Sequence, residues 1–128
     1  GNIVFKDNNK KKLLEKIIHP EVNLQRKKWL EFVKRQKYKI ACFDIPLLFE
    51  TKGEKRCDYV VVASCPFFLQ KQRVLGRNNM TVNKFYNILK NQINDFEKRK
   101  RAHFIINTGN GHRFSRNQVK KLIDKVLT

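Results

Sequence analysis

Two arginines four positions apart are the residues of this sequence best suited to chemistry on a phosphate. Arg73 and Arg77 lie in the segment QKQRVLGRNNM, residues 70–80. If the segment is helical, both side chains project from one face. Guanidinium groups are planar, permanently charged and able to bind phosphate oxygens in pairs. The spacing therefore indicates an anion site, although a solvated face on a basic protein would give the same pattern.

A second set of polar residues lies where apolar runs end. Asp44 follows the run IACF, and Asn107, Thr108 and Gly109 follow the run FII. In open parallel sheets, ligands bind beyond the carboxyl ends of the strands. Glycine at such a place lets the backbone approach a ligand closely. Asp44, Asn107 and Gly109 are therefore candidate ligand residues, while Asp44 could equally cap a turn at the strand end.

Three short apolar runs predict the strands that would position these residues. They lie at 39–45, 59–64 and 103–107. Their nearly continuous hydrophobicity is typical of a parallel sheet covered on both faces. Helical patterns separate the runs after position 38. One begins at Pro66, one is capped by Thr81 or Asn83, one covers 94–102, and the last is capped by Ser115. The alternation predicts an α/β fold with three layers.

The region before position 38 predicts a pair of helices. Asp7 is the expected N-cap of the first helix, which carries apolar residues at helical spacing from Leu13 to Ile18. Pro20 should interrupt it, because proline lacks the N–H donor and disfavours helix in the residue before it. A second amphipathic helix follows. We therefore expect a helical subdomain at 1–37 and an α/β region at 38–128.

Composition restricts the class of protein. With 128 residues, 41% of them hydrophobic, the chain can bury one core of ordinary size. No apolar run reaches the roughly 18–20 residues that a membrane-spanning helix needs. Cys42 lies in an apolar strand pattern, which indicates a reduced core thiol in a cytoplasmic protein.

The formal charge of +18 has three possible explanations. A basic surface can bind nucleic acid by neutralising phosphates and releasing counterions. It can also attract a small anionic ligand. A bias of composition toward lysine explains it equally well, since the lysines are spread over helix surfaces and no arginine-rich arm is present.

Several stretches, taken in order, resemble the dephospho-CoA kinases. They are IVF, LLEKIIHPEV, DIPLLFE, DYVVV, QRVLGRN, ILKNQ and EKRKRAHFIINTG. The resemblance covers essentially the whole chain. It implies a P-loop-kinase-like parallel sheet, with ATP and Mg²⁺ as cofactors and dephospho-CoA as the small-molecule substrate. The implied activity is ATP-dependent phosphorylation of the ribose 3′-hydroxyl, the last step of coenzyme A biosynthesis.

The resemblance also implies roles for individual residues on the nucleotide side. Arg73 and Arg77 would belong to a helical lid at about 67–98. Arg73 would lie against the adenine, whereas Arg77 would reach the ATP phosphates as a catalytic residue. Asn107 and Gly109 would lie beside the adenine.

On the substrate side, the resemblance implies that Asp44 faces the reacting ribose and phosphates as the second catalytic residue. The remaining implied substrate residues are Pro46, Leu47, Leu48, Phe49, Glu50 and His19. The three large apolar residues among them, at 47–49, are expected to be exposed as a wall for the substrate. His19 would belong to the CoA-side subdomain, although a histidine that ends a helix and bonds locally is the alternative.

One motif that the resemblance requires is absent. The phosphate-binding loop G-x-x-x-x-G-K-[ST] occurs nowhere in the 128 residues. In the family this loop lies in the N-terminal third, so we expect the chain to lack that part and the strand between 39–45 and 59–64. We therefore expect the chain alone to be unstable or rearranged, and inactive as a kinase. A non-catalytic module that binds nucleic acid is the alternative function.

Two smaller departures concern the last strand and the hinge of the lid. His103 stands where the family usually has aspartate, which leaves open how the last strand is anchored. Asn94 stands where proline often follows the Gln92 segment, which affects the hinge between the lid and the core.

Overall fold

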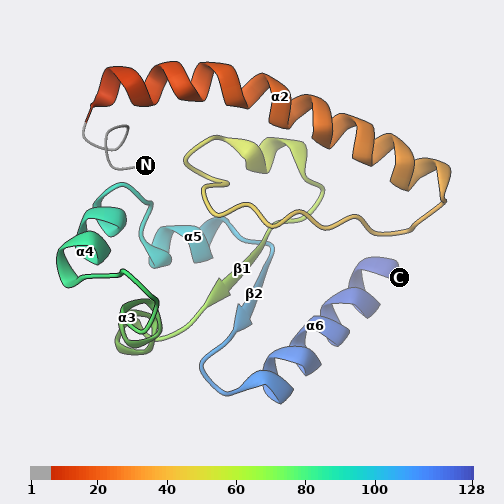
Figure 1. Ribbon diagram of the computed structural model, residues 1–128. Helices are drawn as coiled ribbons and strands as arrows, with labels where there is room; N and C mark the ends of the chain where they lie inside the picture. The colour runs from red at the N-terminus through yellow and green to blue at the C-terminus, as the bar shows by residue number, and fades with distance from the viewer. Residues whose placement is uncertain (1–6) are drawn as a thin grey trace. The chain divides into compact units, whose positions relative to one another are not determined.

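The computed structural model describes residues 7–128 in two compact units, residues up to Phe43 and Asp44–Thr128 (Figure 1). Residues 38–43 therefore group with the N-terminal helix, whereas the sequence places the boundary at 37. None of the helices at 7–128 is both long and apolar enough to cross a bilayer.

The first unit contains one long helix, α2 (Asn8–Arg35). Its predicted N-cap is confirmed: the Asp7 carboxylate accepts hydrogen bonds from the backbone N–H groups of Asn9 and Lys10 at 2.9 and 3.4 Å. The expected interruption is wrong, because Pro20 lies inside the continuous helix. An interior proline costs about 3 kcal/mol, yet it removes only one hydrogen bond, so the turns on either side can persist.

The chain leaves α2 without forming the predicted strand at 39–45. The two strands in the described part of the chain pair with each other, so this segment has no partner strand for its backbone groups. Instead, Phe43 returns to α2, where its ring meets Trp29 edge to face at 4.9 Å. Cys42 is exposed, which corrects its assignment to a buried strand.

The second unit contains a parallel strand pair, β1 (Val61–Ser64) and β2 (Phe104–Asn107). Both lie in runs predicted as strands. Val62 is buried with Phe49 on one face of the pair, and Ile106 is buried on the other. However, Val61 beside Phe104 is 45% exposed, and Ile105 beside Val62 is 41% exposed. Each face is therefore covered only in part by the described residues.

Four helices and one short turn complete this unit. Their bounds are η1 (Gly53–Arg56), α3 (Phe67–Leu75), α4 (Val82–Lys90), α5 (Asp95–Arg101) and α6 (His112–Leu127). Figure 1 shows α3, α4 and α5 on the β1 side of the strand pair and α6 on the β2 side. Packing of α5 on β1 and α6 on β2 agrees with this view. The α/β fold is therefore present, with a sheet of two strands in the described residues.

In this unit one predicted helix cap, Thr81, is confirmed and another, Ser115, is wrong. Thr81 caps α4 and Asn94 caps α5, each accepting from a backbone N–H three residues later. Ser115 is not a cap: α6 begins three residues earlier, after Gly111. The Ser115 hydroxyl instead donates to the backbone carbonyls of Asn107 and Gly111, both at 3.1 Å.

Helices α3 and α4 share a small core. Phe85 of α4 is buried, and its ring lies 6.0 Å from that of Phe67 and 5.3 Å from that of Tyr86. Lys71 of α3 donates a hydrogen bond to the hydroxyl of Tyr86 at 3.2 Å. The two helices therefore pack as a helical hairpin in the connection from β1 to β2.

Candidate functional site

The carboxyl ends of the two strands meet at one edge of the sheet, because Ser64 pairs with Asn107. Helix α3 begins soon after β1, and α6 begins soon after β2. We define the carboxyl rim as Ser64, Arg73, Asn107, Thr108 and Gly109. In open parallel sheets this edge is the usual place for a ligand.

Arg73 is fixed to the rim by two hydrogen bonds. Its Nη2 donates to the backbone carbonyl of Thr108 at 2.9 Å, and its Nη1 donates to the Thr108 hydroxyl at 3.3 Å. The side chain is exposed. The structure therefore brings Arg73 together with the segment at 107–109 across 35 residues of sequence.

Asn107 shapes the loop after β2. Its Oδ1 accepts the backbone N–H of Gly109 at 2.8 Å, while its own backbone N–H and C=O bond to the amide of Gln118 at 3.0 and 2.9 Å. The Gln118 side chain thus occupies both main-chain groups of Asn107. The Nδ2 donor of Asn107 has no partner among residues 7–128, so it remains available for a ligand.

Gly109 lies in a tight space. A Cβ atom at this position would come within 3.1 Å of Asn107 Oδ1 and 3.2 Å of Pro66 Cδ. A side chain here would therefore push against the start of α3. The glycine allows the loop after β2 to approach that helix closely.

Arg77 differs from the sequence prediction. Helix α3 ends at Leu75 and Gly76 is its C-cap, so Arg77 lies two residues beyond the helix. Arg73 and Arg77 therefore do not share a helix face. The Arg77 guanidinium is exposed, and it has no partner among the described residues 7–128. It remains a free charge next to a turn.

The segment 44–50 is attached elsewhere in the unit. Phe49 is only 6% exposed and packs with Val60 and Val62, and Leu48 packs against the same cluster. The expectation that residues 47–49 form an exposed wall is therefore wrong for Phe49 and Leu48. The cause is that the strand pair needs apolar cover on this face, and this segment supplies it. Leu47 remains 43% exposed.

Both carboxylates of this segment can be placed. Glu50 is half-buried: its Oε1 accepts the backbone N–H of Ile93 at 2.8 Å and lies 3.8 Å from Lys98 Nζ. Asp44 and Pro46 are exposed. Asp44 makes no hydrogen bond or ion pair within residues 7–128, so the structure does not join it to Arg73 or Arg77.

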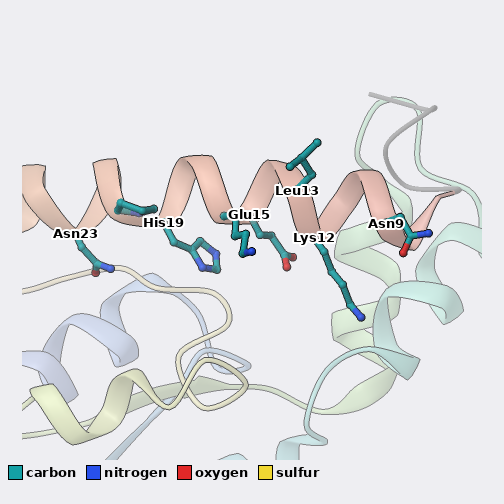
Figure 2. A pocket seen from close by; sticks show the side chains of 8 residues that line it. Asn9, Lys12, Leu13, Glu15, His19 and Asn23 are labelled. Atoms are coloured by element: carbon teal, nitrogen blue, oxygen red, sulfur yellow. The ribbon is translucent and has the colours of Figure 1, made fainter.

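His19 lies on a polar stripe of α2. Figure 2 shows His19 on the same side of the helix as Lys12 and Asn23, whereas Leu13 points away. These residues line a shallow depression together with Asn9 and other residues of α2. Because a single helix supplies all of its lining, it is an open face, and its charged side chains are Lys12, Lys16 and Glu15.

The rim also contains residues that the sequence analysis did not select. Thr108 holds Arg73, and the Ser64 hydroxyl donates to Asp95 Oδ2 of α5 at 2.8 Å. The place of Thr108 between two candidates could have suggested its role. The pairing of Ser64 with Asp95 spans 31 residues and has no local signal.

The two departures from the family pattern have structural partners. His103 Nδ1 accepts the backbone N–H of Val60 at 3.0 Å, and this bond anchors the start of β2 beside β1. Asn94 caps α5 through the backbone N–H of Glu97 at 2.9 Å. Each polar side chain therefore fixes the element that it precedes.

A metal ion has no ready-made site in the described residues. No three side chains of His, Cys, Asp or Glu at 7–128 are arranged to hold one.

Comparisons with known proteins agree with this architecture. A family model described as "Dephospho-CoA kinase" matches residues 1–113. A dephospho-CoA kinase of Bartonella henselae is 47% identical over 127 residues, which cover 99% of this chain and 65% of the relative. Its counterpart in Agrobacterium fabrum is 42% identical over 126 residues, with 98% and 65% covered.

Two solved structures share the fold of this chain. A crystal structure of a Thermus thermophilus protein superposes with a TM-score of 0.83 at 28% identity, covering 99% of this chain and 64% of that one. A dephospho-CoA kinase from Campylobacter jejuni superposes with a TM-score of 0.60 at 27% identity, covering 98% and 61%. The chain thus spans 65% of the length of the first curated relatives that it matches.

Proposed function

The chain belongs to the dephospho-CoA kinase family, and we propose that it supplies the nucleotide rim and substrate segment of an ATP:dephospho-CoA 3′-phosphotransferase. The product would be coenzyme A, in a cytoplasmic pathway. The observation that carries the proposal is the attachment of Arg73 to Thr108 beside Asn107 and Gly109. It places a cationic plane at the edge of the sheet where a nucleotide would bind.

The rim would hold the adenine of ATP. Arg73 is exposed and is bonded through two nitrogens along its edge, an arrangement that would let a base stack on the planar guanidinium. Asn107 Nδ2 can donate to a ring nitrogen. Gly109 allows the backbone to lie close to the base. These contacts would orient the nucleotide without taking part in the transfer.

Arg77 would stabilise the transferring phosphoryl group. Phosphoryl transfer is accelerated mainly by positioning and by charge placed where negative charge develops. A guanidinium without a protein partner can bind phosphate oxygens bidentately. Mg²⁺ would accompany ATP and neutralise part of its charge, and we assign no residue of this chain to it.

The substrate side would be the exposed part of the segment 44–50. Asp44 carries a carboxylate with no partner in the described residues and would face the ribose hydroxyl of dephospho-CoA. Pro46 and Leu47 would contact the substrate, with Leu48, Phe49 and Glu50 supporting them from beneath. His19 of α2 would be a further substrate-binding residue, as the family resemblance implies.

The 128 residues contain no phosphate-binding loop of the Walker type. We therefore predict that this chain alone releases no ADP above background with Mg·ATP and dephospho-CoA, because backbone amides and the loop lysine are needed to hold the β- and γ-phosphates. ADP release by the isolated chain would contradict this assignment.

The test of the proposal is nucleotide binding and turnover by the full-length gene product that contains these residues. Arg73→Ala should weaken ATP binding about tenfold or more, since a charge-assisted or stacking contact contributes about 1–3 kcal/mol. Arg99→Ala is the matched control, because Arg99 is an equally exposed charge in the last turn of α5. Equal ATP affinity in Arg73→Ala and Arg99→Ala would show that the carboxyl rim is not part of the nucleotide site.

The charge of +18 supports a second candidate, a nucleic-acid-binding module. Such a module loses affinity steeply with salt, with a slope of about −0.9 in log K per phosphate contacted. A kinase would instead bind adenine nucleotides and CoA-like molecules. Titrating the protein with duplex DNA and with ATP at two salt concentrations separates the two functions.

A further inference from the structure

We propose that Thr108 is the positioning residue that orients Arg73 for the nucleotide. The inference deepens the proposed function and rests on it, because it assumes that Arg73 contacts ATP. Thr108 itself would touch only protein. Its role would be to fix the plane of the guanidinium before the nucleotide arrives.

The Thr108 hydroxyl has one orientation that satisfies both of its neighbours. It lies 3.2 Å from the backbone carbonyl of Ser64, which can only accept, and 3.3 Å from Arg73 Nη1, which can only donate. Its single proton therefore points to Ser64, and an oxygen lone pair points to Arg73. This arrangement fixes the edge of the guanidinium that carries Nη1 against the Thr108 hydroxyl.

The backbone of Thr108 gives the Arg73 side chain a second point of attachment. Its carbonyl accepts from Arg73 Nη2 at 2.9 Å. Two attachment points on separate nitrogens restrict rotation of the guanidinium plane. A single bond would leave it free to turn about that contact.

Thr108 is itself held by the strand next to it. Its backbone N–H donates to the carbonyl of Ser64 at 2.8 Å, which continues the pairing of β1 with β2 by one residue. Ser64 in turn bonds to Asp95 through its hydroxyl at 2.8 Å. The orientation of Arg73 is therefore fixed by the paired strands β1 and β2, through Ser64 and Thr108.

A fixed plane reduces the conformational entropy that Arg73 loses when a base stacks on it. The contact is equally present in the ground state and the transition state, since adenine takes no part in the transfer. Loss of Thr108 should thus raise KM for ATP and leave kcat nearly unchanged. A residue that merely supports the fold would lower stability without this selective effect.

The test compares Thr108→Val, which keeps the shape and removes the hydroxyl, with Thr108→Ser, which keeps the hydroxyl. In the full-length gene product, Thr108→Val should weaken ATP binding about threefold to tenfold, the range expected for one exposed hydrogen bond. Thr108→Ser should restore wild-type affinity. Thr128→Val is the matched control, because it removes a threonine hydroxyl at the end of α6.

Arg73→Ala separates failure of this inference from failure of the proposed function. If Arg73→Ala weakens ATP binding while Thr108→Val equals the wild type, Thr108 has no positioning role and the nucleotide site stands. If Arg73→Ala has no effect, the proposed role of Arg73 fails first. In the double variant Arg73→Ala/Thr108→Val, Thr108→Val should cause no further loss of ATP affinity, because the guanidinium that it orients is gone.

A measurement on the unmodified protein covers the case in which Thr108→Val does not fold. Nitrogen-15 NMR reports rotation about the Nε–Cζ bond of each arginine. Arg73 should rotate more slowly than Arg99, whose guanidinium has no partner within residues 7–128. Equal rotation rates for the two arginines would overturn the inference.

Discussion

The carboxyl rim is held by polar side chains, whereas the segment 44–50 is held mainly by apolar packing. At the rim, Arg73, Thr108 and Asn107 bond to main-chain groups and remain at the surface. In the segment 44–50, Phe49 is buried against β1, and Asp44 is left outside. The comparison teaches that removing an exposed rim side chain such as Arg73 should leave the core intact, whereas removing the buried ring of Phe49 should not.

The largest expected effect sharpens that contrast through Phe49. Phe49→Ala removes a buried ring from the cluster with Val60 and Val62 and should lower the free energy of unfolding by about 3–5 kcal/mol. Leu47→Ala, at a position that is 43% exposed, is the control and should cost less than about 1 kcal/mol. Urea denaturation measures both. Equal losses would mean that the segment is not divided into a buried and an exposed part.

The next effect concerns turnover rather than stability. Arg77→Ala in the full-length gene product should lower kcat about 10²–10³-fold, as expected for losing one group that stabilises developing charge. The free energy of unfolding should not change, because the Arg77 guanidinium has no partner among residues 7–128. Steady-state ADP release measures the effect, with Arg99→Ala as the control. Unchanged kcat would exclude Arg77 from the site.

A smaller effect tests the close approach at the rim. Gly109→Ala should cost about 1–3 kcal/mol of stability, because its Cβ would lie 3.1 Å from Asn107 Oδ1 and 3.2 Å from Pro66 Cδ. At Gly76 the nearest atoms are at 3.5 and 3.6 Å, so Gly76→Ala should cost nothing or stabilise slightly. Thermal unfolding of the two variants gives the comparison. A neutral Gly109→Ala would show that the rim loop has room to move.

The smallest effect concerns the bond between Ser64 and Asp95. Ser64→Ala should cost about 0.5–1.5 kcal/mol, the usual net value of one hydrogen bond. Asp95→Ala should cost a similar amount. The double variant should cost less than the sum, because the two side chains share one interaction. Additive losses would show that the bond contributes nothing in solution.

Local signals in the sequence predicted much of the second unit. Short patterns predicted the apolar runs of β1 and β2 and the cap Thr81, and the resemblance implied the approach of Arg73 to the segment at 107–109. The strand and cap signals each depend on a few neighbouring residues. The contact of Arg73 with Thr108 spans 35 residues and was implied only by the resemblance.

The errors arise where a distant partner decides the outcome. The run at 39–45 has strand composition, but no strand of the described residues pairs with it. Phe49 looks exposed in an isolated DIPLLFE motif and becomes buried because β1 lies beneath it. Pro20 disfavours helix locally, yet 28 residues of helix form around it. Composition alone cannot reveal these long-range contacts.

The end of α3 before Arg77 sets how this charge can move. Helix α3 ends at Leu75, and the turn that follows is closed by hydrogen bonds from Arg77 N–H to Val74 and from Met80 N–H to Arg77, at 3.1 and 3.2 Å. Swinging Arg77 toward a bound phosphate therefore breaks turn contacts of about 1 kcal/mol each and unwinds no helix. Such a rearrangement falls in the nanosecond-to-microsecond range of loop motion, well ahead of a typical catalytic cycle.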